Sequence, residues 1–108
     1  MKYHAPIPQE KWNTLSTIEQ MANIGSEVSR AIHWRGKDIK SMHMAIYRAL
    51  ELLVLSVEDT KNAQRLKEIL RVQECIADDF LGENIYHFTD EWWQKYFLEY
   101  AVAARRYT

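Results

Sequence analysis

The sequence contains little cysteine, proline or glycine. Its 108 residues include one Cys, two Pro and three Gly. A single cysteine excludes a disulfide within the chain and is typical of a reducing compartment, so we expect a cytoplasmic protein. Few proline and glycine residues, together with 47% hydrophobic and 27% charged residues, are typical of a packed globular domain and not of a disordered tail.

Neither sign of charge is in excess, and no hydrophobic run is long. Fourteen Lys and Arg residues oppose fifteen Asp and Glu residues, which gives a net charge of -1. This balance argues against a basic surface for general nucleic-acid binding. The longest strongly apolar stretch, 52–57, is far shorter than the ~20 residues of a membrane span. The N-terminus shows no cationic segment followed by an apolar core. We therefore expect neither a membrane partner nor a secretory signal.

The chain is long enough for one domain and too short for two. Pro6 and Pro8 lie two residues apart near its start, where fixed φ angles and missing N–H donors disfavour a helix. We expect residues 1–13 to form an extended N-terminal arm, held to the domain by Trp12. Residues 14–108 are expected to form a single four-helix-bundle domain.

Start and stop signals divide this domain into four helices. They are a capping box at Ser16 and Glu19, N-caps at Asp38 and Thr89, and helix-ending glycines at Gly36 and Gly82. Within each segment apolar residues recur every three or four positions, which is the spacing of a helix with one buried side. Gly25 lies in the first of these stripes at a cost of about 1 kcal/mol relative to Ala, so we expect a close helix approach there.

Short connections make consecutive helices antiparallel neighbours. No alternating apolar pattern of the kind that predicts strands competes with the helical one. The sequence therefore predicts an all-α fold, specifically an antiparallel up-down-up-down four-helix bundle with an extended N-terminal arm.

The motifs of common enzymes are missing. A di-iron bundle needs Glu-x-x-His, which this chain lacks, and there is no phosphate-binding glycine loop. Cys75 follows an acidic residue, which disfavours a reactive thiolate. An acidic group near the end of the third helix leaves a small metal-dependent hydrolase open as an alternative, through Glu74, Asp78, Asp79 and Glu83. Because no Glu-x-x-Glu array occurs, we favour a solvated acidic patch, and we expect no enzyme, cofactor or metal.

Positive charge is local. One group of basic residues surrounds the turn between the first two predicted helices, and another lies in the first half of the third helix. Together they comprise Arg35, Lys37, Lys40, Lys61, Arg65, Lys67 and Arg71. A solvated helix face is the simpler interpretation. These residues also support an alternative function as a nucleic-acid-binding accessory protein, in which they contact phosphates and binding weakens steeply with salt.

Aromatic residues are abundant, and they concentrate in the fourth helix. Trp92 and Trp93 are adjacent, about 100° apart on a helix, so one bundle core cannot easily bury both. Apolar aromatic residues with polar tips are enriched at protein interfaces. The predicted interface comprises Trp92, Trp93, Tyr96, Tyr100, Leu52 and Leu55. We therefore expect a non-enzymatic interaction or assembly protein that forms a homo-oligomer or binds another protein.

Three segments support a family resemblance. Residues 18–28 (IEQMANIGSEV), 48–53 (RALELL) and 93–97 (WQKYF) resemble a family of short uncharacterised bacterial four-helix-bundle proteins, from which no activity transfers. The four-helix plan is more distantly similar to the accessory variability proteins of diversity-generating retroelements and to ribosomal intervening-sequence proteins. That likeness implies a ring-shaped homo-oligomer, pentameric in those relatives, that binds a reverse transcriptase and nucleic acid through basic surfaces.

Overall fold

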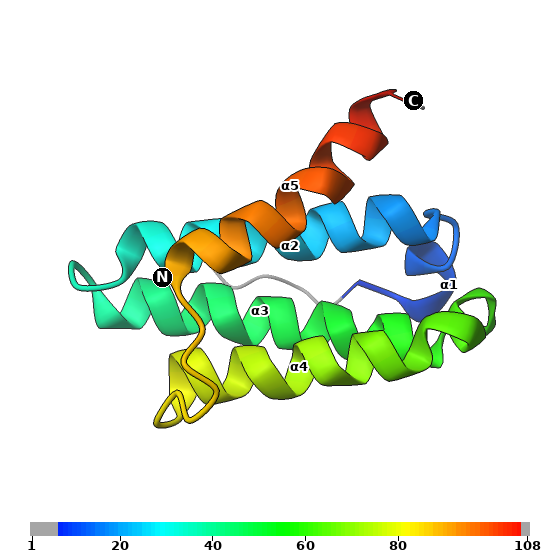
Figure 1. Cartoon of the computed structure of the whole chain (residues 1–108). Coiled ribbons are helices and arrows are strands. Elements are labelled where there is room, and N and C mark those ends of the chain that lie inside the picture. The colour runs from blue at the N-terminus through cyan, green and yellow to red at the C-terminus, as the bar shows by residue number, and fades with distance from the viewer. Residues whose placement is uncertain (1–6, 107–108) are drawn as a thin grey trace.

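The computed structural model describes residues 7–106, and this part of the chain is helical with no strand (Figure 1). The helices are α1 (Gln9–Trp12), α2 (Thr17–Trp34), α3 (Ile39–Glu58), α4 (Leu66–Leu81) and α5 (Asp90–Arg106). A 3₁₀ helix, η1 (Thr60–Arg65), precedes α4. The all-α prediction is confirmed. No helix within residues 7–106 is long and apolar enough to cross a membrane.

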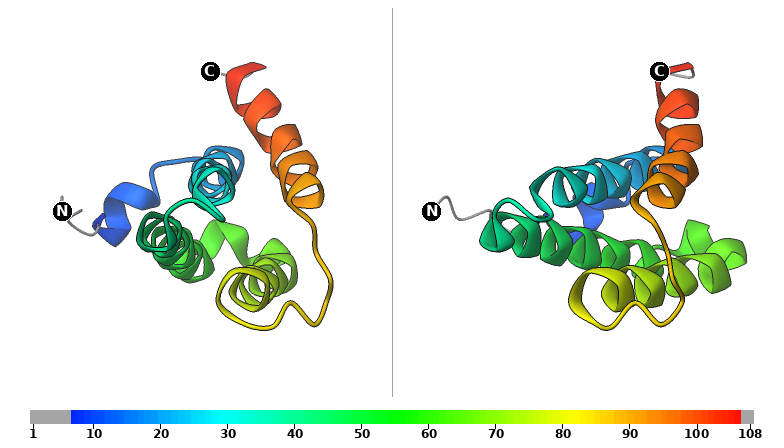
Figure 2. Two further views of the ribbon diagram at one scale, coloured as in Figure 1. Left: turned by 90° about the vertical axis from the view of Figure 1, so that its left-hand side faces the viewer. Right: turned by 60° about the vertical axis from the view of Figure 1, so that its left-hand side comes forward.

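The helices α2, α3 and α4 lie side by side in alternating directions, and α5 packs against α2 (Figures 1 and 2). The second half of α5 turns away from the other helices. Its two buried residues, Trp93 and Phe97, both lie in its first half, and beyond Tyr100 no large side chain of the described part of α5 packs against the core. The structure therefore does not confirm a closed up-down-up-down bundle.

The predicted N-terminal arm is wrong in part. Residues 9–12 form α1 and are not extended, since Pro8 precedes the helix, where a missing N–H donor costs nothing. Trp12 is buried as expected, and its Nε1 donates a hydrogen bond to Ser56 Oγ at 3.0 Å. The extended conformation predicted for residues 1–6 concerns positions outside the described residues.

Most predicted helix boundaries are confirmed. Ser16 and Glu19 form the capping box, and the Asp38 side chain caps α3. Gly36 has φ +79°, in the left-handed region that favours glycine. The Thr89 hydroxyl accepts a hydrogen bond from the Trp92 N–H at 3.1 Å, as an N-cap does. These contacts are local, so the sequence specifies them without knowledge of the tertiary fold.

Gly25 is where α2 and α5 approach most tightly. A Cβ atom on Gly25 would lie only 2.7 Å from Phe97 Cβ, a distance that real Cβ contacts do not show. The close helix approach expected at this glycine is confirmed, and the helix that approaches is α5. Gly25 thereby determines how deeply Trp93 and Phe97 enter the core.

A buried polar network joins α1, α2, α3 and η1 at one end of the molecule. Gln20 Nε2 donates to the Trp12 carbonyl oxygen at 3.1 Å and to Asp59 Oδ2 at 2.8 Å, and Asn62 Nδ2 donates to Gln20 Oε1 at 2.8 Å. Burial favours a raised pKa for Asp59, but hydrogen bonds from Lys61 and Gln20 outweigh burial and lower the pKa. Gln20, Asp59 and Asn62 are all buried, so this network fixes the arrangement of the four elements.

Candidate interaction surfaces

Aromatic rings form a continuous row along the side of α5 that faces α4. The row runs from Phe88 through Trp92 and Tyr96 to Tyr100, with ring centroids 4.6, 5.3 and 5.7 Å apart in turn. The residues are spaced four apart, which places them on one side of the helix. Trp92, the second ring of the row, is 45% exposed, whereas Phe88, Tyr96 and Tyr100 are partly buried against the core.

Glu68 of α4 holds the other end of this row. Its carboxylate accepts a hydrogen bond from the Tyr96 hydroxyl and another, at 2.9 Å, from the Tyr100 hydroxyl. Arg65 lies 3.5 Å from the same carboxylate. Burial, followed by the hydrogen bond to Glu68, raises the pKa of Tyr96 and that of Tyr100. The two tyrosines thus link α5 to α4 only while they are protonated.

We expect the fold to weaken in alkali because of this link. A tyrosine whose pKa is raised by folding contributes its full stability below its unfolded pKa of about 10 and loses it as the pH rises further. The free energy of unfolding, measured by urea titration, should fall above pH 10 by less than about 1.4 kcal/mol per pH unit for each tyrosine.

Tyr96→Phe tests this explanation because it removes one ionising hydroxyl. The variant should be about 1 kcal/mol less stable at neutral pH, through the lost hydrogen bond, and its stability should fall less steeply above pH 10. Equal alkaline slopes for the two proteins would contradict the assignment.

The predicted interface is wrong for two residues. Trp93 is only 1% exposed, and Leu52 is likewise buried in the core, so neither is available to a partner in this fold. Trp93 lies about 100° around α5 from Trp92, on the side of Phe97 that packs into the core. Tyr96, Tyr100 and Leu55 are partly buried against the core. Of the six predicted residues, Trp92 is the one with a largely open side chain.

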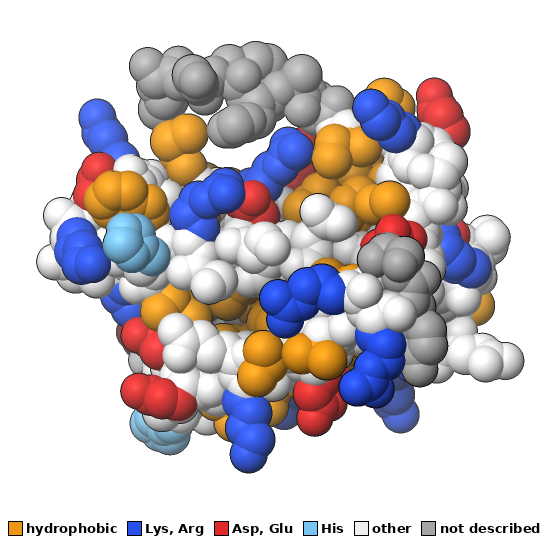
Figure 3. Space-filling view, turned by 90° about the horizontal axis from the view of Figure 1, so that it is seen from above, with side chains coloured by type: hydrophobic (Ala, Val, Ile, Leu, Met, Phe, Trp, Pro, Cys, Tyr) orange, Lys and Arg blue, Asp and Glu red, His pale blue; other side chains and the backbone are white. Residues whose placement is uncertain are grey.

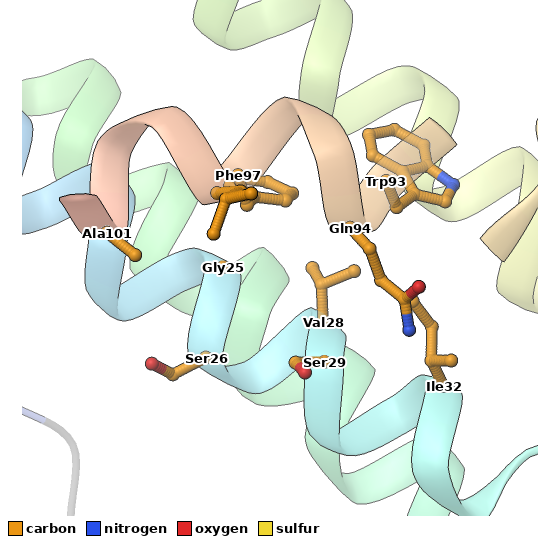
Figure 4. Close-up of a pocket in the computed structure, with 10 residues that line it drawn as sticks. Gly25, Ser26, Val28, Ser29, Ile32, Trp93, Gln94, Phe97 and Ala101 are labelled. Carbon is orange, nitrogen blue, oxygen red and sulfur yellow. The ribbon is translucent and has the colours of Figure 1, made fainter. Parts of the chain in front are cut away.

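A groove of about 340 Å³ runs between α2 and α5 (Figure 4). Phe97 lies over Gly25 in this groove, and Ser26 and Ser29 line the α2 side. Leu98 is exposed on the α5 side. Figure 3 shows this side of the molecule, where hydrophobic side chains alternate with Lys and Arg. The groove was not predicted, because it depends on the angle at which α5 leaves α2.

A further apolar surface lies on α3 and α4. We define the α3–α4 face by exposed hydrophobic side chains on these neighbouring helices, namely Tyr47, Val54, Leu66, Leu70 and Leu81. Tyr47 is 56% exposed, Val54 47% and Leu70 46%. Several large apolar residues exposed together are typical of a binding surface. This face could not be recognised from spacing alone, because Leu66 and Leu70 recur at the same helical interval as buried apolar residues do.

The acidic group does not form a metal site in the structure. Asp79 accepts hydrogen bonds from Arg35 and from Trp93 Nε1, and Asp78 accepts the N–H groups of Ile85 and Tyr86. Glu74 accepts the Tyr86 hydroxyl at 3.1 Å, whereas Glu83 is exposed. Among residues 7–106 no three His, Cys, Asp or Glu side chains are placed to hold a metal ion. Glu74, Asp78 and Asp79 therefore hold the α4–α5 connection in place through these hydrogen bonds.

Cys75 is buried. Burial raises its pKa, and Glu74 and Asp78 raise it further, against a lowering by Arg71. A raised thiol pKa disfavours thiolate chemistry.

Most of the predicted phosphate-binding residues already have carboxylate partners. Arg35 pairs with Asp79 and Asp90, Lys61 with Asp59, Arg65 with Glu68, and Arg71 with Glu74. Lys37, Lys40 and Lys67 form no ion pair within the described part of the chain. Four of the seven basic residues are thus partly neutralised, which reduces the charge available to a phosphate backbone.

The exposed apolar and aromatic residues of these surfaces come from α3, α4 and α5. Comparison of the chain with protein-family models, with curated proteins and with solved structures finds no match.

Proposed function

We propose that the protein is a non-enzymatic assembly module that binds further copies of itself through exposed apolar helix faces. The observation that carries this proposal is the exposure of large hydrophobic side chains on two separate parts of the surface. One is the α3–α4 face, and the other is the side of α5 that carries Trp92 and Leu98. Burial of such surface between copies contributes about 25 cal/mol per Å², which favours association against the loss of translational and rotational freedom.

Nucleic-acid binding receives less support from the geometry. Four of the seven basic residues are paired with carboxylates, and the net charge of the chain is -1. The distant resemblance to accessory variability proteins remains an argument for a ring of subunits. Because those relatives are pentameric, a ring of five copies is a second proposal, which the measured mass of the assembly decides.

Sedimentation velocity on the full chain tests self-association directly. At tens of micromolar we expect a species whose mass is a multiple of 12.9 kDa, and it should persist in high salt because apolar contacts are not screened. A monomer at every concentration would overturn the proposal. Association that disappears in high salt would favour a charge-driven assembly in its place.

A further inference from the structure

The α3–α4 face is open because the other sides of both helices are occupied. Ala45 of α3 lines a hollow together with Trp34 of α2, so this side of α3 adjoins α2. Glu68 of α4 contacts Tyr100 of α5, so this side of α4 adjoins α5. The α3–α4 face lies on the remaining sides, where no element of residues 7–106 crosses it (Figure 2).

Charge is ordered along the outer side of α3. Lys40, Tyr47, Glu51, Val54 and Glu58 are spaced 7, 4, 3 and 4 residues apart, and this spacing places them on one side of a helix. The first is basic and the last is acidic, and Tyr47, Glu51 and Val54 lie between them. All five side chains are exposed, and the three charged ones form no ion pair within residues 7–106.

The order of charges along α3 is complementary to the same order on a second α3 helix that runs in the opposite direction. We infer that a second copy of this chain occupies the α3–α4 face, with the two α3 helices antiparallel about a two-fold axis. A two-fold axis makes every contact occur twice, so a helix that is basic at one end and acidic at the other pairs with its own copy. The register that places Lys40 opposite Glu58 of the second copy also places Tyr47 opposite its Glu51, since both pairs are centred on position 49. The same register places Val54 opposite Met44 of the second copy, since this pair is also centred on position 49, and both of these apolar side chains are exposed.

The size of the face suits such a contact. A helix of 20 residues, the length of α3, is about 30 Å long, and α4 lies beside it at an interaxial distance of about 8–10 Å. With a helix diameter of about 10 Å including side chains, a strip across both helices measures about 600 Å², which approaches the ~800 Å² per partner that a standard interface buries. A second copy explains the charge order as well as the exposed apolar side chains, whereas an unrelated partner explains only the apolar side chains. The inference rests on the proposed function and specifies its interface.

Charge reversal at the two ends of α3 tests this pairing. Lys40→Glu and Glu58→Lys, measured singly by sedimentation equilibrium on the full chain, should each weaken self-association about tenfold, because two symmetry-related attractions become repulsions. The double variant, K40E with E58K, restores both pairs and should return the dissociation constant to within about threefold of the wild type. Lys11→Glu is the matched control and should change nothing, because Lys11 is exposed on α1, which carries no residue of either apolar surface.

The outcomes separate the interface from the function. Both substituted side chains are exposed, and thermal melts should confirm that all variants fold. Wild-type association that neither single variant weakens would overturn the α3–α4 interface and leave the proposed function intact. Single variants that weaken association without rescue by the double variant would overturn the antiparallel register. A monomeric wild type would overturn both proposals.

Discussion

Asp79→Ala should lower the free energy of unfolding by about 3 kcal/mol, as expected when one member of a buried ion pair is removed. The Asp79 side chain is 2% exposed, and its Oδ1 lies 2.8 Å from Arg35 Nη2. Its Oδ2 accepts a hydrogen bond from Trp93 Nε1 at 2.7 Å. Asp79 therefore joins the end of α2, the end of α4 and the start of α5 in one contact.

The magnitude follows from what the substitution leaves behind. Trp93 is buried, and its indole N–H would lose its partner, which costs about 1–3 kcal/mol. Arg35 would lose a charge partner but keeps Asp90 at 2.7 Å and remains partly exposed, so the total lies near the lower end of the range for buried pairs. Urea denaturation followed by circular dichroism and by tryptophan fluorescence measures it.

Asp78→Ala is the matched control, because it removes the neighbouring carboxylate from the same helix end. Asp78 accepts two backbone N–H groups of the connection to α5, so we expect a loss of only about 1 kcal/mol. If both variants lose the same stability, the Arg35–Asp79–Trp93 contact has no special role. Asp79→Asn should fall between the two, since it keeps the shape but removes the charge.

The structural roles of these polar residues could have been found from their position in the apolar stripes. Asp79 follows Ile76 by three residues and Val72 by seven, and Gln20 precedes Ile24 by four. A polar residue at such a position is buried with its side of the helix and needs a partner. The partner itself could not be predicted, because Asn62 lies 42 residues from Gln20 and its position depends on the whole fold.

The helices were predictable for a different reason. Capping residues such as Ser16 and Asp38 act on backbone groups within the next turn, so the local sequence determines them. The direction of α5 is not local. It depends on how Trp93 and Phe97 are buried against α2 while Trp92 remains exposed, and the spacing of apolar residues within α5 does not specify the angle at which it crosses α2.

Gly25→Leu tests the contact that sets this direction. A Cβ atom at this position would lie 2.7 Å from Phe97 Cβ, and the branched leucine side chain needs still more room. Overpacking of this kind costs about 1–3 kcal/mol and occasionally more, against a gain of about 1 kcal/mol in helix propensity over glycine. We expect a net loss of up to about 2 kcal/mol, measured by urea denaturation. The first half of α5 should move off α2, which exposes Trp93 and shifts tryptophan emission to longer wavelength.

Ser26→Leu provides the control for the added side chain. Ser26 is the next residue on α2, it is exposed, and it lies at the edge of the same groove. Leucine there has open space, so stability should change by less than about 0.5 kcal/mol, as for an ordinary surface substitution, and the emission maximum should not move. If Gly25→Leu behaves like Ser26→Leu, then α5 accommodates a side chain at the crossing, and the close approach at Gly25 does not set the depth at which Trp93 and Phe97 are buried.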